Sequence, residues 1–333
     1  MNARFTNSGL RAITVLGSLL FGALAHVQAQ AQAQNFPTKT ITIVVPAAPG
    51  GVSDVMARVL AKHFGDAWGQ QVIVENRGGA NHVIGAAMVG KAAPDGHTLM
   101  VGAETIFVIN PSLHGSKLAY DVKDFAPVTG LVRINQGLLA HPSLPANTIA
   151  ELIALAKQKP GQINYGTSGI GAAGHVNVAL LETMAGIKLA PVHYRGATPA
   201  LNDVIAGHIM LTSVSLSSSV PPYKAGHAKL LGVGSLQRRP EIPEVPAVAE
   251  TVPGYEAITW FGLFTTNGTP PAVIGKINAE VQKVFADPAF RERYITPNLF
   301  ETMTSSPEQF AAFIKADSVK WAKVIRDANI RVD

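Results

Sequence analysis

The chain has 333 residues, of which 47% are hydrophobic and 15% charged, with a formal net charge of +5 and no cysteine. This composition excludes intrinsic disorder, which requires few apolar residues and a high charge, and the lack of cysteine excludes disulfides, thiol catalysis and thiolate metal sites. Lysine and arginine are scattered, so the mild positive charge favours a small anionic ligand and predicts no binding of nucleic acid.

Residues 1–34 have the order of a secretory signal peptide. Arg4 and Arg11 precede an apolar run at 12–25, and alanines with Ala-x-Ala spacing follow at 29–33. The apolar run is shorter than the roughly 20 residues that a transmembrane helix needs. We therefore expect cleavage and a periplasmic mature protein, in preference to a retained anchor or a core helix.

The rest of the chain alternates strand and helix patterns. Strands are predicted at 40–45, 72–75, 99–102, 163–165, 192–194, 209–214 and 229–233. Helices are predicted at 53–64, 84–93, 148–157, 176–185 and 273–284, and from Ser306 onward. This alternation is typical of an α/β fold with parallel sheets and helices on both faces.

Two long extended stretches, Phe125–His141 and Glu250–Thr266, have the character of crossings between domains. About 300 mature residues are near the upper limit for one hydrophobic core. Two crossings predict one lobe from residues 35–135 and 256–333, and a second from residues 136–255. A ligand is expected in the cleft between the lobes, at the carboxyl ends of the strands. We expect a monomer.

A Pro/Gly-rich loop at 46–54 joins the first strand to the first helix. Gly50 and Gly51 permit a sharp turn with no Cβ in the way of a ligand. The N–H groups of the following helix favour an anion. Ser53 or Asp54 could instead simply cap that helix, so the pattern alone leaves both interpretations open.

A second glycine-rich loop, GTSGIGAAGH at 166–175, also lies between a strand and a helix. It matches the dinucleotide fingerprint formally, but Tyr194 and Arg195 stand where the ribose-binding acid is required. A cradle of backbone N–H groups with Thr167 and Ser168 for a small anion fits the same geometry.

Three enzyme patterns are incomplete. The segment around Ser168 lacks one glycine of the nucleophile elbow, because Ile170 occupies that position. The segment 85–92 resembles a phosphate loop, but Ala92 replaces the hydroxyl that would hold Mg²⁺. The histidines are dispersed and form no H-x-x-x-H pair. We therefore expect no enzyme activity, no cofactor and no metal.

Four other side chains have two interpretations each. Arg195 could bind a carboxylate bidentately, or form an ordinary surface ion pair. His175 is more typical of packing at a helix start than of a ligand contact. Trp260 and Phe261 are more typical of core or hinge packing than of a pocket wall.

Nine segments occur in the order found in one protein family: VVPAAPGGVSD, WGQQVIVENRGGA, GAAMVGKAAPDGHTLMVG, INPSL, YDVKDFAPVT, ELIALAKQKPGQINYGTSGIG, HYRGATPAL, PEIPEVPAVAE and WFGLFTTNGTP. Over residues 36–330 the chain resembles the Bug-type receptors of tripartite tricarboxylate transporters. The resemblance implies a type II periplasmic-binding-protein (flytrap) fold, whose two α/β lobes close on a ligand. It also implies a two-subunit integral membrane permease as partner.

The resemblance further implies ligand contacts from five segments, largely through the backbone and water. The candidate ligand-binding residues are Ala47, Ala48, Pro49, Gly50, Gly51, Ser53 and Asp54; Thr105, Ile106 and Phe107; Gly166, Thr167, Ser168, Gly169, Ile170, Gly171, Ala172 and His175; Arg195, Gly196 and Ala197; and Ser213, Val214 and Ser215.

Departures from the family pattern narrow the range of expected ligands. The family often has small or polar residues where Ile106 and Phe107 stand, and often acids where Met210 and Val214 stand. A buried ammonium without a counter-charge is costly, so we expect a small organic carboxylate without an amino group, aromatic or a dicarboxylate. The expected role is capture and delivery to the permease. The alternatives are a sensor feeding a signalling partner and, more remotely, an exported hydrolase.

Overall fold

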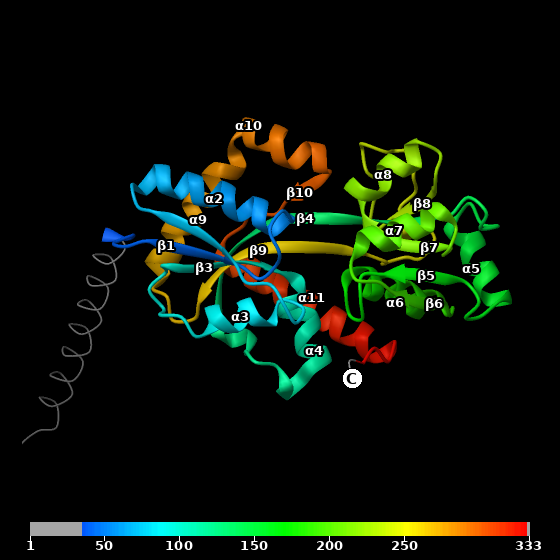
Figure 1. The fold of residues 1–333 in the computed structure, drawn as a ribbon, viewed down its shortest axis with the longest axis horizontal. Helices are drawn as coiled ribbons and strands as arrows, with labels where there is room; N and C mark the ends of the chain where they lie inside the picture. The colour runs from blue at the N-terminus through cyan, green and yellow to red at the C-terminus, as the bar shows by residue number, and fades with distance from the viewer. Residues whose placement is uncertain (1–34, 332–333) are drawn as a thin grey trace, which may run out of the picture.

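One strand of sixteen residues, β4 (Phe125–Ala140), takes part in two sheets. The structure is a computed structural model and describes residues 35–331, so the predicted signal peptide lies outside the described residues. From Phe125 to Asn135, β4 pairs with the antiparallel strand β9 (Ile258–Thr266). From Gln136 to Ala140 it pairs instead with β7 (Leu211–Ser215). Both long strands run between two α/β lobes (Figure 1).

The first lobe is built on a sheet with the order β2–β1–β3–β9–β4. Its further strands are β1 (Ile41–Val45), β2 (Val72–Asn76), β3 (Thr98–Ala103) and β10 (Phe300–Thr302). Helices α2 (Val52–Trp68), α9 (Pro271–Ala286) and α10 (Pro288–Phe290) cover one face. On the other face lie α3 (Val83–Gly90), α4 (Asn110–His114) and α11 (Pro307–Asp327) (Figure 1).

The second lobe continues the sheet in the order β4–β7–β5–β6, and β8 also pairs with β4. Its further strands are β5 (Asn164–Thr167), β6 (Ala190–His193) and β8 (Lys229–Val233). Its helices are α5 (Ile149–Gln158), α6 (Ala173–Ala185), α7 (Ala197–Ala206) and α8 (Leu216–Lys224). The two lobes confirm the predicted α/β class.

The parallel pairing that the alternation predicts is present in each lobe, and antiparallel strands are added to it. Strands β1, β2 and β3 are parallel to one another, as are β5, β6 and β7. The crossing strands β4 and β9 run antiparallel to each other and to their neighbours, because the chain enters the second lobe on one and returns on the other.

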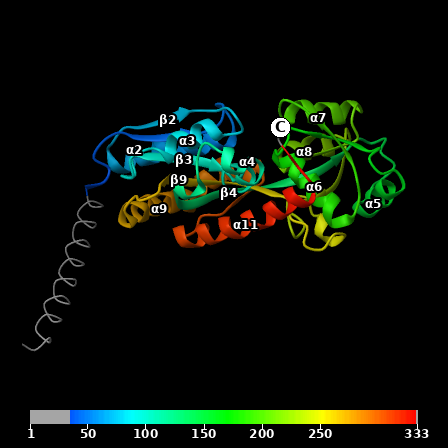
Figure 2. The same cartoon turned by 90° about the horizontal axis from the view of Figure 1, so that it is seen from below.

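Helix α11 extends from the first lobe to the second (Figure 2). Its N-cap Ser306 forms a capping box with Gln309, which satisfies two backbone donors of the first turn. Its buried face carries Phe310 and Trp321 and belongs to a hydrophobic cluster that contains residues of both lobes. The two lobes therefore share a core along this helix. No helix in residues 35–331 is both long enough and apolar enough to cross a membrane.

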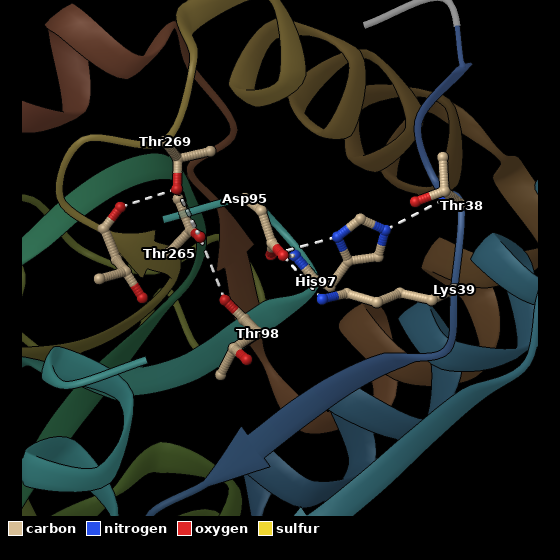
Figure 3. Close-up of polar contacts among 8 residues, drawn as sticks. Thr38, Lys39, Asp95, His97, Thr98, Thr265 and Thr269 are labelled. Carbon is tan, nitrogen blue, oxygen red and sulfur yellow. Dashed lines mark hydrogen bonds and ion pairs between the residues drawn. The ribbon is translucent and has the colours of Figure 1, made fainter. Parts of the chain in front are cut away.

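A polar cluster fixes the end of the first lobe at which β3 begins (Figure 3). The His97 ring accepts a hydrogen bond from the backbone N–H of Thr38 at 3.1 Å, and its other nitrogen lies 3.1 Å from Asp95. Asp95 also pairs with Lys39 at 2.8 Å. These bonds attach the segment before β1 to the start of β3, whose other end reaches the junction of the lobes.

Candidate functional site

A cavity of about 360 Å³ lies where the two lobes meet. The ends of β3 and β7, the crossing strands β4 and β9, and the starts of α2, α3, α6, α7 and α8 form its wall. The lining residues are Val52, Asn81, His82, Ala103, Glu104, Thr105, Ile134, Gln136, Ser168, Ala172, Ala173, Gly174, Ala197, Ser213, Val214, Ser215, Thr259, Trp260 and Phe261. This volume suits a small molecule.

Three helices of the second lobe begin at the cavity without a side-chain cap. The N-caps are Ala172 for α6, Gly196 for α7 and Ser215 for α8, and none of their side chains accepts from the first turn. The first N–H groups of a helix lack intrahelical partners and carry a partial positive charge. Three such termini around one cavity favour an anionic group.

The wall combines apolar and polar side chains and contains no lysine or arginine. Hydroxyl groups come from Thr105, Ser168, Ser213, Ser215 and Thr259. Gln136 of β4 donates to the Thr259 hydroxyl of β9 at 3.2 Å, which holds both groups in place across the crossing. An anion in this cavity would be held by hydroxyl and main-chain donors.

Internal hydrogen bonds hold the loop between β5 and α6. The Thr167 hydroxyl accepts from the N–H of Gly169 at 3.2 Å and lies 2.8 Å from Nδ1 of His193. Nδ1 of His175 accepts from the N–H of Gly171 at 3.1 Å. Burial, with a smaller effect of nearby His193, lowers the pKa of His175 to about 4. His175 is therefore neutral at pH 7 and stabilises the loop as an acceptor.

Gly174 allows α6 to approach the end of β7. A Cβ at this position would lie 2.7 Å from the carbonyl oxygen of Ser213. Only glycine permits so close a contact with a backbone atom. Both residues line the cavity, so this contact sets the distance between the α6 amides and the hydroxyl of Ser213.

The loop after β1 borders a neighbouring cavity of about 570 Å³, which Ala47, Ala48 and Pro49 line and which shares Asn81 and His82 with the first. Asp54 braces this loop, accepting from the Gly50 N–H, Asn76 and Arg58 at 2.9–3.0 Å. Burial alone would raise the pKa of Asp54, but these bonds hold it below its usual value. Its carboxylate is occupied and does not face the cavity as a free acceptor.

A strained turn at 80–82 supplies two lining residues. Ala80, Asn81 and His82 all have positive φ, at 46°, 50° and 74°, which is uncommon without glycine. A pair of hydrogen bonds between Asn81 and Asn110, both at 2.9 Å, holds the turn. Nδ1 of His82 lies 2.5 Å from the Pro46 carbonyl oxygen. A carbonyl only accepts, so Nδ1 carries the proton and Nε2 is an acceptor.

The structure brings some of the predicted site residues into the cavity wall and places others elsewhere. Those that line it are Thr105, Ser168, Ala172, Ala197, Ser213, Val214 and Ser215. Ile106 and Phe107 lie in the core instead, where the Phe107 ring stacks on Phe264 at 3.9 Å between centroids. Arg195 is exposed and does not line the cavity. The remaining predicted residues, Gly50, Gly51, Ser53, Gly166, Thr167, Gly169, Gly171 and Gly196, shape the loops around it.

Ile170 lines a separate cavity of about 380 Å³, together with Leu113 and Leu118 of the first lobe. The neighbouring Gly171 has φ +72°, and a Cβ there would lie 2.3 Å from the Leu113 side chain. The tip of this loop therefore contacts α4 across the gap between the lobes.

Several lining residues were not predicted: Val52, Asn81, His82, Ala103, Glu104, Ile134, Gln136, Ala173, Gly174 and Thr259. Trp260 and Phe261, expected in core or hinge packing, also reach the wall. A signal was present for some, since Asn81 and His82 lie next to the glycines of ENRGGA and Glu104 is an acid at the end of an apolar strand. Residues 35–331 hold no cluster of three or more His, Cys, Asp or Glu placed for a metal ion.

Comparisons with known proteins identify the family of this chain. The family model described as "Tripartite tricarboxylate transporter family receptor" matches residues 56–330. A protein from the tcbD-tcbE intergenic region of Pseudomonas sp. strain P51 is 34% identical, with 91% of each chain covered. Protein BugT of Bordetella pertussis is 29% identical, with 97% of this chain and 98% of that protein covered.

Solved structures show the same fold. The R. palustris Rpa4515 structure with adipate has a TM-score of 0.77 at 32% identity, covering 89% of this chain and 99% of that one. MatC from Rhodopseudomonas palustris with bound malate has a TM-score of 0.73 at 29% identity, covering 87% of this chain and 100% of that one. These similarities confirm the fold class and the family that the nine segments predict.

Proposed function

Because this chain belongs to the tripartite tricarboxylate transporter receptor family, we propose that it captures a small organic carboxylate in the periplasm and delivers it to a two-subunit integral membrane permease. In this proposal residues 1–34 are a cleaved signal peptide, and no bond of the ligand is made or broken. The protein acts as a monomer. Its lobes, residues 35–135 with 256–333 and residues 136–255, close over the ligand.

The observation that carries the proposal is the cavity between the lobes, with three uncapped helix N-termini from the second lobe and five hydroxyl groups in its wall. These groups are hydrogen-bond donors suited to carboxylate oxygens. In the proposed complex, the ligand contacts Thr105, Ser168, Ala197 and the segment 213–215. The loop with Ala47, Ala48 and Pro49 borders the same space.

The composition of the wall supports a ligand without an amino group. Ile134, Val214 and Phe261 provide apolar surface for a hydrocarbon body. Adipate and malate, named in the structures of two relatives, both lack an amino group. Ile106 and Phe107 do not contribute to this argument, because they lie in the core.

Thermal unfolding of the mature protein, residues 35–333, tests the binding of a carboxylate. The panel contains adipate, malate, citrate, aromatic acids, glutamate, aspartate and a sugar. A ligand at 100 times its Kd adds about 2.7 kcal/mol to the free energy of unfolding, which raises Tm by several degrees. We expect such a shift with one class of amine-free acid.

The matched variants are Ser213→Ala, in the cavity wall, and Ser143→Ala, which is exposed and outside it. Ser213→Ala should reduce the ligand-induced shift, and Ser143→Ala should leave it unchanged. A shift with a sugar or an amino acid, and with no amine-free acid, would contradict the proposal.

Delivery is tested separately from binding. Loss of the protein should abolish cellular uptake of the acid that raises its Tm. Unchanged uptake, together with loss of a transcriptional response to that acid, would instead identify a sensor.

A further inference from the structure

One carboxyl side chain lies in the wall of the cavity. Glu104 follows the last residue of β3 and precedes the π-helical turn Thr105–Ile109, and it is only 3% exposed. Among the lining residues it is the single acid, and no lysine or arginine accompanies it. A buried acid in a cavity that we assign to an anion requires an explanation.

The hydrogen bonds of Glu104 leave one oxygen free. Its Oε2 accepts from the backbone N–H of Trp260 at 2.7 Å. Oε1 has no hydrogen-bond partner within residues 35–331, and the side chain takes part in no ion pair there. Oε1 is not among the fully buried atoms that lack a partner, so it is accessible in a residue that is otherwise buried and lines the cavity. An accessible, unpartnered oxygen in a cavity wall is a position at which a ligand group can complete the hydrogen bonding.

The charged groups around Glu104 do not neutralise it. On α11, Asp317 accepts from the Trp260 indole at 2.7 Å, and Lys320 is bonded to the backbone oxygen of Glu256 at 2.8 Å. On β4, the guanidinium of Arg133 lies over the Phe313 ring, 5.1 Å from its centroid. His82, across the cavity, is bonded to a carbonyl oxygen.

Burial raises the pKa of Glu104 well above its usual value, and the charge of Asp317 raises it further. The Trp260 N–H and Lys320 act in the opposite direction with smaller effect. An anionic ligand in the cavity would add to the rise, because it opposes a second negative charge beside it.

We propose that Glu104 binds the ligand as the neutral acid and donates a hydrogen bond from Oε1 to a carboxylate oxygen of that ligand. This inference rests on the proposed function. An O–H donor to a carboxylate is among the stronger hydrogen bonds of proteins. The same group explains how a wall without lysine or arginine can take up an anion next to an acid.

The proposal makes affinity depend on pH in one direction. Binding is strong while Glu104 holds its proton and weakens as the pH rises through its pKa. Above that pH, the affinity for a fully ionised carboxylate should fall by up to about tenfold per pH unit, since binding then requires uptake of one proton.

Calorimetric titration of the mature protein with adipate and with malate, from pH 6 to pH 9.5, tests this. The key variant is Glu104→Gln, whose amide oxygen can still accept from Trp260 and whose N–H₂ can still donate. We expect wild-type affinity to fall over the pH interval in which Glu104 loses its proton, as the infrared measurement below locates it. The variant should bind within about threefold of wild type at pH 6 and change little with pH.

An infrared measurement reports the proton itself. Wild type at pH 7 should show the carbonyl band of a protonated carboxyl group that is missing from Glu104→Gln, and the comparison removes any contribution from Asp317. Near-ultraviolet circular dichroism of the variant checks that the surroundings of Trp260 are intact.

The outcomes separate the two proposals. If neither adipate nor malate nor any other acid binds wild type at any pH, the proposed function is wrong and this inference with it. If an acid binds and wild type shows no protonated carboxyl band at pH 7, or if its affinity does not change over the pH interval in which that band disappears, only the role of Glu104 is overturned. The same holds if Glu104→Gln loses more than tenfold at every pH.

Discussion

At the scale of single residues, the start of α6 shows how the binding loop is held. The imidazole of His175 accepts the N–H of Gly171 from four residues earlier, and Gly174 lets the helix meet the backbone of β7. Neither residue needs to touch the ligand to matter for binding. Both fix the position of main-chain donors at the cavity.

The pKa of His175 predicts how stability depends on pH. Its value is about 4 in the folded protein and about 6.5 in the unfolded chain, so the unfolded state binds more protons between these values. Stability is complete above about pH 6.5 and is lost as the pH falls toward 4, by roughly 3 kcal/mol at most from this group. His175→Asn keeps an acceptor near Nδ1 and does not titrate.

Urea unfolding of wild type and His175→Asn between pH 4 and pH 8 measures this contribution. The difference in free energy of unfolding between the two should shrink or reverse in favour of the variant as the pH is lowered. A constant difference over the whole range would show that His175 does not titrate with folding.

Gly174→Ala should weaken both folding and binding. The added Cβ meets the Ser213 carbonyl oxygen, so α6 must move away from β7, at a cost of about 1–3 kcal/mol in stability. Ligand affinity should fall by fivefold or more, since about 1 kcal/mol of lost binding corresponds to that factor.

Gly275→Ala is the matched control. Gly275 lies within α9, where a Cβ would have no neighbour within 4 Å. Alanine there should stabilise the protein by about 0.4–1 kcal/mol and leave affinity unchanged. Equal effects of the two variants on affinity would show that the close approach of Gly174 is not needed.

At the scale of elements, the tip of the β5–α6 loop contacts α4 across the gap between the lobes. Leu113 lies against Gly171 and shares a cavity with Ile170. This apolar contact joins two lobes and therefore favours the closed arrangement. Leu113→Ala should weaken ligand binding by about fivefold, corresponding to roughly 1 kcal/mol of lost apolar burial.

Calorimetry with the bound acid measures the loss, and small-angle X-ray scattering reports whether the liganded protein is more extended. Leu236→Ala is the control, because Leu236 is 54% exposed and lies outside this contact. Unchanged affinity in Leu113→Ala would show that the contact does not assist closure.

Strand and helix patterns predicted most elements, and the exceptions have physical reasons. The helix at 197–206 is not among the predicted helices, and its Pro199 stands in the first turn, where the missing N–H has no partner to lose. The helix at 216–224 contains Pro221 and Pro222, and two prolines in sequence are typical of a loop. The antiparallel crossing of β4 and β9 depends on pairing between residues more than a hundred positions apart.

The candidate site was predictable as a set of loops and less so as a set of side chains. Glycine-rich spacing located the turns after β1 and β5, but it does not say which way a neighbouring side chain points. Phe107 therefore lies in the core, and Arg195 lies outside the cavity wall. Glu104 and Gln136 reach the wall because of how the strands of the junction pair, which local sequence does not encode.

At the scale of the whole molecule, an anion site without lysine or arginine in its wall predicts weak salt dependence. Surface charges are screened within about 10 Å at 0.1 M salt, whereas hydrogen bonds inside a closed cavity are screened much less. Raising sodium chloride from 50 to 500 mM should change affinity for the bound acid by less than about threefold.

Calorimetry at constant pH over this range checks the expectation, with the thermal unfolding of the free protein as reference. A steep fall in affinity with salt would indicate that exposed cations such as Arg195 attract or hold the ligand.

The uncapped helix starts around the cavity affect how the ligand specificity of such receptors can change during evolution. Every residue except proline carries a main-chain N–H, so substitutions in the wall can alter the shape and polarity of the space while the donors to the anionic group persist. The same fold can then change its ligand specificity through a few substitutions, each of which leaves the anion-binding donors in place. Relatives that share about 30% of their residues with this chain, and whose structures contain acids as unlike as adipate and malate, are the outcome expected of such a scaffold.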